Sequence, residues 1–455
     1  MMNHNHSRYQ VRLDFIHRLL SEHFGLPDTE VTPIAYDPEC PFKYNNFVYR
    51  ISLSAPLNKQ IETCQVQPGC VPIPRGSSKL ILRLTNPDAQ GMGSANRVEN
   101  EVAIITLAAA ALGSIFKPHI VPHLYGWSGS RSAQGDHQQG WILQELISGS
   151  PLDECLDSMD LEDKKRVFAQ IAKVLKCLQE FPLPSSITHF GGLTFDANGE
   201  IISAPMTSTG IGPWSSYEAS FKARLEQALR EADENQYIQG WHANGVRARL
   251  ETFVEHGLPS GFEPLDSREQ RAIIHADFSE YLSLNILFVT GPHTYPLTAP
   301  SNILFDASSG HITGIIDYDF SCTLHPSYEF LRSFSGLGGQ FRGWSGVEGH
   351  EQKALKDAKL NCFPDTFPDE KDKESLVQWK VAKVWEDKLE RAGCKRPSTM
   401  PGIDRVADVD ALLSSILPWR VTNSDILRRQ SDEVIRKCRD DNEGVLIKIL
   451  EHNGF

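Results

Sequence analysis

Three short segments of the sequence each set a carboxylate or a carboxamide beside an apolar run. They are 274–279 (IHADFS), 300–306 (PSNILFD) and 314–319 (GIIDYD). Phosphoryl transfer from ATP needs a base for the acceptor, one or two Mg²⁺ ions, and oxygen ligands that hold those ions against the triphosphate. One Asp, one Asn and a second Asp can supply that set, and the candidates here are Asp277, Asn302 and Asp317.

Each of these carboxylates also has a purely structural interpretation. Asp277 taken alone is typical of a residue that caps a turn, and Asp317 is typical of a solvated turn. However, the mainly apolar run 312–316 predicts that Asp317 ends a buried strand, where an unpaired carboxylate is costly and a metal would offset the cost. Asp319 is either a structural hydrogen-bonding residue or a secondary metal contact. In combination, the carboxylates and Asn302 favour the functional interpretation.

The combined motifs resemble those of the aminoglycoside phosphotransferase and choline kinase-like family, whose catalytic loop reads H-x-D-x-x-x-x-N and whose metal loop reads I-D-W/Y-D. The resemblance covers about residues 40–335, and the segments 395–397 (KRP) and 417–419 (LPW) are similar to fungal members. It implies an α+β, bilobal protein-kinase-like fold, with a small β-rich amino-terminal lobe and a larger, mainly helical carboxyl-terminal lobe. It also implies ATP and Mg²⁺ as cofactors.

The resemblance assigns roles to the residues of the three segments. Asp277 would be the catalytic base, and Asn302 and Asp317 would be the metal ligands. His275 belongs to the same catalytic motif, where bracing the loop through hydrogen bonds is favoured over proton transfer.

The spacing departs from the family pattern between Asp277 and Asn302. The family spacing is restored only if the twenty residues 280–299 are removed, so that HADFS is followed directly by PSNILFD. Asn285, inside that segment and also followed by Ile-Leu-Phe, is a rival metal ligand. Asn302 is preferred because an acidic, Gly-containing turn follows it and because it stands fifteen positions before Asp317.

Two hypotheses explain the segment 280–299. It is a retained intron, since Ser279-Glu280-Tyr281 can be encoded with a GTGAGT donor and Thr298-Ala299 with a CAG acceptor. Alternatively, it is a real insertion that separates the base from its metal ligand and weakens catalysis. Sequencing the transcript decides between the two.

The amino-terminal half holds the residues that the resemblance places around the nucleotide. Arg83, in the run LILRL, would contact the phosphates, with Glu101 on the following helix as its partner and Glu99 as a competitor. The other nucleotide contacts would be Asn45 and Asn46, in a turn over the phosphates, and the backbone of Glu145 and Ile147, at the hinge beside adenine.

Periodicity predicts the elements that must position these groups. For a first lobe, residues 1–147, it predicts helices at 11–24 and 99–112, with Gly113 at the C-cap, and strands at 47–53, 79–84, 120–127 and 140–146. For a second lobe, residues 148–455, it predicts helices at 161–181, 216–232 and 245–256, a hairpin at 191–202, short strands within 273–320, and helices after about 348. The region 203–270, with Trp214 and Trp241, is expected to shape the acceptor pocket together with the carboxyl-terminal helices.

Composition excludes several classes of partner. The 455 residues carry 58 Asp and Glu against 45 Lys and Arg, a formal net charge of −13, which argues against nucleic acid as the main partner. Nine scattered cysteines predict reduced thiols. The amino terminus lacks the apolar core of a signal peptide, and no run approaches the ~18 apolar residues that span a bilayer. These features predict a cytoplasmic protein without a membrane partner.

The sequence leaves two candidate functions. One is an ATP-dependent phosphotransferase that transfers the γ-phosphoryl group to a hydroxyl of a small-molecule acceptor. The alternative is a kinase-like nucleotide-binding or interaction protein that the segment 280–299 has weakened or inactivated as a catalyst.

Overall fold

The computed structural model describes residues 5–34, 36–37, 40, 42–62, 67–92, 94–129, 139–278, 302–346, 349–364 and 373–455. The segment 280–299, and with it Asn285, lies outside the described residues. Nothing in the fold therefore bears on the structure of that segment itself.

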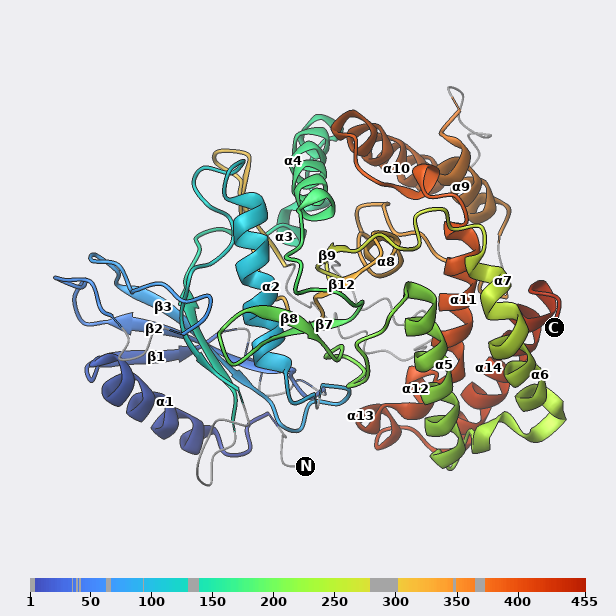
Figure 1. Cartoon of the computed structure of the whole chain (residues 1–455), viewed down its shortest axis with the longest axis horizontal. Coiled ribbons are helices and arrows are strands. Elements are labelled where there is room, and N and C mark those ends of the chain that lie inside the picture. Colours follow the sequence, from blue (N-terminus) through green and yellow to red (C-terminus); the bar gives the residue numbers. More distant parts are fainter. Residues whose placement is uncertain are drawn as a thin grey trace.

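A five-stranded antiparallel sheet forms the amino-terminal part of the molecule (Figure 1). Its spatial order is β1-β2-β3-β5-β4, and the strands are β1 (Thr29–Pro33), β2 (Asn46–Leu53), β3 (Lys79–Thr85), β4 (Leu124–Ser128) and β5 (Trp141–Glu145). Alternate residues of a strand point to opposite faces, so each face can be covered separately. In β5, Trp141 and Leu143 join the core under α1 (Tyr9–Phe24), whereas Ile142 joins the core that contains α2 (Arg97–Leu112).

The helix α1 closes one face of this sheet. Ile16 and Leu20 are fully buried against Leu80 and Leu82 of β3, as expected for an amphipathic helix. Gly25 ends the helix in the left-handed conformation (φ 63°), where its N–H bonds the carbonyls of the last turn.

The helix α2 lies on the opposite face and connects the sheet to the rest of the molecule. Val102, Ala103 and Ile104 are fully buried in the same core as Phe168 of α4 (Leu161–Glu180). Because α2 packs against both parts, side chains at its amino end can contact residues of either. The boundary after residue 147 stays a prediction.

The carboxyl-terminal part is mainly helical (Figure 1). Besides α4, its helices are α3 (Asp153–Leu156), α5 (Tyr217–Glu234), α6 (Val246–Thr252), α7 (Leu258–Phe262), α8 (Ser327–Arg332), α9 (His350–Asn361), α10 (Lys373–Ala392), α11 (Ile403–Ile416), α12 (Trp419–Thr422), α13 (Ser424–Leu427) and α14 (Asp432–His452). Its strands are β6 (Ser150–Pro151), β7 (Gly192–Phe195), β8 (Ile201–Ala204), β9 (Ala272–Ile274), β10 (Ile303–Asp306), β11 (His311–Ile315) and β12 (Cys322–Leu324).

Short strands bring the three chemically interesting loops together. The strand β9 pairs with β12, and β10 pairs with β11 and β6, all antiparallel. The loop of Asp277 follows β9, Asn302 immediately precedes β10, and Asp317 follows β11. The predicted α+β fold, with a β-rich amino-terminal part and a larger, mainly helical carboxyl-terminal part, is confirmed.

Several details of the prediction were wrong. The strand β1 was missed because TEVTP is short and ends in proline, and the strand expected at 120–127 begins only at Leu124. Gly113, in contrast, stands at the C-cap of α2 as predicted, with a right-handed φ of −63°. Trp241 is fully buried and donates its indole N–H to the Ile416 carbonyl at 2.9 Å, so it is a core residue and lines no open acceptor pocket.

Two further observations concern the helices and the thiols. None of the helices in the described part of the chain combines the length and apolarity needed to cross a membrane. The described cysteines, which exclude Cys64, are all free thiols.

Candidate active site

A buried acid of α8 holds the loop that carries Asp277. The Glu329 carboxylate accepts the backbone N–H groups of His275 at 2.7 Å and Ala276 at 3.0 Å. Ser333 donates its hydroxyl to Glu329 at 2.6 Å and accepts the N–H of Phe278 at 3.0 Å. Burial raises the pKa of Glu329 to about 7. These bonds offset the cost of a left-handed Ala276 (φ 62°), so the loop has one defined shape.

His275 braces the same loop from inside the core. Its side chain is fully buried, its Nε2 lies 3.0 Å from the Ile316 carbonyl, and its ring stacks on Phe278 at 4.2 Å. Burial lowers the pKa of His275 to about 3, which keeps the ring neutral. A neutral ring that donates to Ile316 fixes the spacing between two loops, which matches the bracing role expected for His275.

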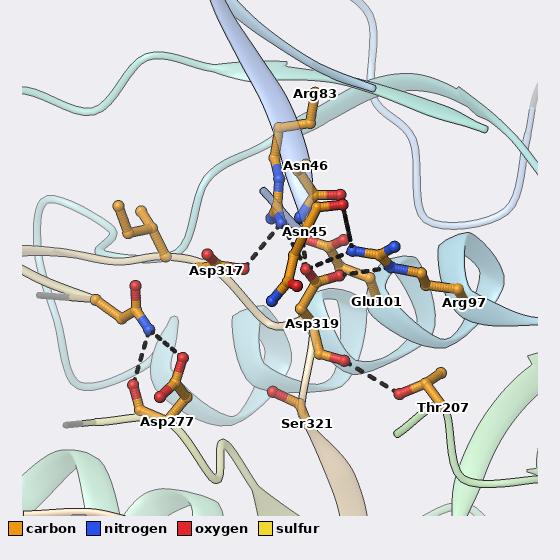
Figure 2. Close-up of polar contacts among 12 residues, drawn as sticks. Asn45, Asn46, Arg83, Arg97, Glu101, Thr207, Asp277, Asp317, Asp319 and Ser321 are labelled. Atoms are coloured by element: carbon orange, nitrogen blue, oxygen red, sulfur yellow. Dashed lines mark hydrogen bonds and ion pairs between the residues drawn. The ribbon is translucent and has the colours of Figure 1, made fainter. Parts of the chain in front are cut away.

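Asn302 connects Asp277 to the loop of Asp317. Its side-chain amide donates to the Asp277 carbonyl at 2.8 Å and to the Asp277 carboxylate at 2.9 Å, as Figure 2 shows beside the labelled Asp277. Its own backbone carbonyl accepts the N–H of Ile316 at 3.0 Å. Burial, and then the charge of Asp317, raise the pKa of Asp277 well above its ordinary value. The segment 280–299 therefore does not keep Asn302 apart from Asp277.

Arg83 of β3 joins the sheet to the loop of Asp317. Its guanidinium forms ion pairs with Glu101 of α2, with Asp317 at 2.8 Å, and with Asp319 at 3.6 Å. Figure 2 shows these groups converging on Arg83 from separate elements. Burial by itself lowers the pKa of Arg83, but Asp317 and Glu101 raise it, so the group stays charged. Of the two predicted partners Glu101 makes the contact, whereas Glu99 lies against Gly129.

Asp319 is held by a cation that the sequence did not single out. Arg97, the first residue of α2, donates two hydrogen bonds to its carboxylate, at 3.1 and 2.8 Å, and Asn46 donates a third at 2.5 Å. Burial by itself raises the pKa of Asp319, but Arg97 and Arg83 lower it below its ordinary value. Thr207 also donates to the Asp319 carbonyl at 3.1 Å (Figure 2). Of the two roles open for Asp319, these contacts match the structural one.

The two asparagines of the predicted phosphate-covering turn belong to this network. Arg97 donates to the Asn45 carbonyl at 2.9 Å and to the Asn46 side-chain oxygen at 3.1 Å. The Asn46 side chain thus uses both its donor and its acceptor inside the protein. A contact of either residue with phosphate stays a prediction.

The predicted hinge residues lie at the end of β5 and just beyond it. The Glu145 N–H donates to the His123 carbonyl at 2.8 Å, so this amide is not available to a nucleotide. Ile147 is half-buried, and its side chain lies 3.0 Å from the position that a Cβ on Gly314 would take. An adenine contact through the Glu145 carbonyl or the Ile147 backbone stays a prediction.

Comparisons with known proteins bear on the fold. No protein-family model and no curated protein matches the sequence. Among solved structures, the chain is similar to the ADP-bound aminoglycoside phosphotransferase APH(2'')-Ib, with 12% identity over 96% of this chain and 98% of that one, at a TM-score of 0.45. It is also similar to the streptomycin-ATP-APH(2'')-IIa ternary complex, with 13% identity over 96% and 97% and a TM-score of 0.47.

A third solved structure, an aminoglycoside-3'-phosphotransferase of type VIII, has 14% identity over 79% of this chain and 94% of its own, at a TM-score of 0.32.

The donor set at the centre of the site fits a hard divalent cation. Mg²⁺ takes carboxylate and carboxamide oxygens, and Asp317, Asn302 and Asp277 offer such atoms. Asn302 uses its N–H group on Asp277, which leaves its side-chain oxygen for a ligand. The Asp317 side chain is 39% exposed and uses one oxygen on Arg83. Two neighbouring carboxylates, one with a raised pKa, are what a bound cation would stabilise.

The sequence held weak signals for the residues that were missed. Arg97 stands at the first position of a helix, where the partial positive charge of the helix end disfavours a cation unless a carboxylate is near. Glu329 stands within the mainly apolar segment SYEFLRSF, and a buried acid there requires several donors. Neither feature predicts which residue Arg97 or Glu329 contacts.

Proposed function

We propose that this protein is an ATP-dependent phosphotransferase that transfers the γ-phosphoryl group to a hydroxyl of a small-molecule acceptor. The observation that carries the proposal is one connected set of contacts. Asn302 holds Asp277, the Asn302 carbonyl accepts the N–H of Ile316 beside Asp317, and Asp317 contacts the guanidinium of the Arg83–Glu101 ion pair. A positioned carboxylate, oxygen ligands for a cation and a charged guanidinium are the parts that phosphoryl transfer requires.

Asp277 acts as the base in this proposal. Asn302 holds one carboxylate oxygen by a 2.9 Å hydrogen bond, which orients the carboxylate and leaves its other oxygen for the acceptor hydroxyl. The raised pKa of Asp277 matches a group that takes up a proton when the hydroxyl attacks. Glu329, Ser333 and His275 keep the loop in place while this happens.

The other residues serve the nucleotide. Arg83 would contact its phosphates, kept in position by Glu101, and the backbone near Glu145 and Ile147 would contact adenine. Asn302 and Asp317 would hold Mg²⁺, which neutralises charge on the triphosphate when bound with ATP.

A panel assay tests the proposal. The purified protein is incubated with ATP, Mg²⁺ and individual alcohols, amino alcohols and sugars, and both ADP and the phosphorylated product are measured. We expect at least one acceptor to give a product whose formation requires Mg²⁺ and is lost in Asp277→Asn. Absence of Mg²⁺-dependent ATP consumption across a broad panel would count against an enzyme.

The second candidate, a nucleotide-binding protein with little or no turnover, is favoured by the broken spacing between Asp277 and Asn302. Deleting residues 280–299 separates the two. If the segment disables an enzyme, the deletion variant gains turnover over the full chain. A dedicated binding protein gains none, although it still binds ATP. The contact between Asn302 and Asp277 in the full chain supports the enzyme.

A further inference from the structure

A second cluster of ligand-type side chains lies away from the proposed catalytic centre, at the end of the sheet. His119 and His123 belong to the segment that leads into β4, and Glu145 is the last residue of β5. The Glu145 Oε2 lies 2.7 Å from His119 Nε2 and 3.0 Å from His123 Nδ1. One ligand atom from each residue lies within 4.8 Å of the other two.

The backbone holds this cluster in place. The Glu145 N–H donates to the His123 carbonyl at 2.8 Å, and the His123 N–H donates to Glu145 Oε2 at 3.1 Å. The imidazole rings of His119 and His123 lie 4.1 Å apart between centroids, inclined at 50°. Two ring nitrogens therefore converge on a single carboxylate oxygen.

We infer that His119, His123 and Glu145 bind a Zn²⁺ ion. Two imidazole nitrogens and one carboxylate oxygen are a known ligand set for Zn²⁺, and the two histidines have the H-x₃-H spacing of such sites. Around a tetrahedral ion with bonds of about 2.0–2.1 Å, ligand atoms stand roughly 3.3 Å apart. The Glu145 oxygen would therefore move slightly away from the two imidazole nitrogens, which now lie 2.7 and 3.0 Å from it. Imidazole also disfavours the hard cation Mg²⁺ here.

The surroundings leave room for a fourth ligand. The side chains of His119 and His123 are 40% and 45% exposed, and that of Glu145 is 26% exposed, so an ion can enter from solvent. A pocket of about 380 Å³ adjoins the two histidines and is also lined by Lys117 and Leu112. Water or a small anionic ligand in this pocket would complete the coordination.

The site shares only Glu145 with the proposed nucleotide site: the Glu145 backbone would contact adenine, whereas its side chain would bind Zn²⁺. Its three residues are not those that would hold Mg²⁺, and the ion would cross-link the lead-in to β4 with the end of β5. Because the unfolded chain does not hold the three ligands together, Zn²⁺ binding would stabilise the native state.

Titration of the full-length, chelator-treated protein with Zn²⁺, in the absence of nucleotide, tests the inference. We expect one saturable equivalent by calorimetry, a rise in the unfolding temperature, and, with Co²⁺ in place of Zn²⁺, visible absorption bands of a tetrahedral complex. The double variant H119A/H123A and the single variant Glu145→Gln should each bind Zn²⁺ at least tenfold more weakly. Mg²⁺ at the same concentration should produce no comparable heat.

His242 provides a matched control, because it is an exposed histidine that contacts a carboxylate, Asp233, at 3.3 Å without a third ligand. His242→Ala should keep the wild-type stoichiometry and affinity. The inference is overturned if the wild-type protein binds no saturable equivalent, or if H119A/H123A binds Zn²⁺ as tightly as wild type. If a variant fails to fold by circular dichroism, the Co²⁺ spectrum of the wild-type protein still decides, since octahedral bands or no bands contradict the site.

Discussion

Two groups of charges meet at the centre of this molecule, and they differ in how their carboxylates are compensated. On the α2 side, Glu101 and Asp319 are buried and each contacts a guanidinium, from Arg83 or Arg97. On the β9 side, the like charges of Asp277 and Asp317 repel each other. Within the described residues, Asp317 forms an ion pair with Arg83 alone, a guanidinium that also belongs to the first group.

The difference separates a positioning function from a binding function. Buried carboxylates that are paired with guanidinium groups fix the geometry of α2, the sheet and the backbone between Asp317 and Asp319. Carboxylates that are partly exposed and mutually repelling are where a cation and an acceptor would be stabilised. Variants on the β9 side should therefore change turnover, whereas variants on the α2 side should change the free energy of unfolding.

The largest effect is expected on the binding side, in turnover. Asp277→Asn keeps the shape and the acceptor for Asn302 but removes the base, so kcat should fall by about 10²–10⁴-fold. The affinity for ATP should stay near that of wild type. Steady-state kinetics with the acceptor found in the panel measures kcat, and Asp157→Asn, on an exposed residue, is the control. Wild-type turnover in Asp277→Asn would exclude Asp277 as the base.

On the positioning side, the largest effect should be on folding. Arg97→Met leaves the Asp319 carboxylate buried without its two hydrogen bonds from Arg97, which costs about 3–5 kcal/mol of unfolding free energy. Urea unfolding measures this. Arg166, whose exposed guanidinium pairs with Asp163, is the control, and Arg166→Met should cost about 0–1 kcal/mol. Equal losses in the two variants would contradict the distinction.

A smaller change is expected in the metal requirement. Asp317→Asn removes one charged ligand, so the Mg²⁺ concentration that gives half-maximal turnover should rise by about 10–100-fold. Titration of turnover with Mg²⁺ at saturating ATP measures it. An unchanged Mg²⁺ requirement would show that Asp317 does not bind the ion and that it only positions its neighbours.

The smallest effect concerns the pH dependence of stability. Burial lowers the pKa of His275 to about 3, so between pH 6.5 and 3 the unfolded chain binds more protons than the native state at this residue, and stability is lost as the pH falls. His275→Gln should remove about 2 kcal/mol of the loss between pH 6.5 and 5. Urea unfolding at both pH values measures this, with exposed His311→Gln as control. Parallel pH profiles for His275→Gln and wild type would show that His275 is not held neutral.

The sequence predicted best the positions of residues whose secondary structure depends on their immediate neighbours in the chain. The apolar run before Asp317 and the run LILRL around Arg83 predict strand positions, and the structure has β11 and β3 there. The pairing of Arg97 with Asp319 joins positions 222 residues apart and depends on how α2 packs between the two parts of the molecule. Periodicity contains no information on that packing, and it also assigned Trp241 to a pocket when the residue fills the core.

The segment 280–299 shows a different limit. Counting residues between Asp277 and Asn302 suggested that they are separated, but chain length constrains distance only weakly when both ends are fixed by strands. The ends of β9 and β10 bring the two side chains within 2.9 Å. Spacing in sequence was therefore a poor guide to spacing in the site.

The central claim is that Arg83, Asn302, Asp317 and Asp277 form one site for ATP and Mg²⁺, and calorimetric titration with a non-hydrolysable ATP analogue tests it most directly. The account predicts one equivalent bound by the wild-type protein, with an affinity that falls when Mg²⁺ is removed. No binding at millimolar analogue, or binding that is indifferent to Mg²⁺, would contradict it.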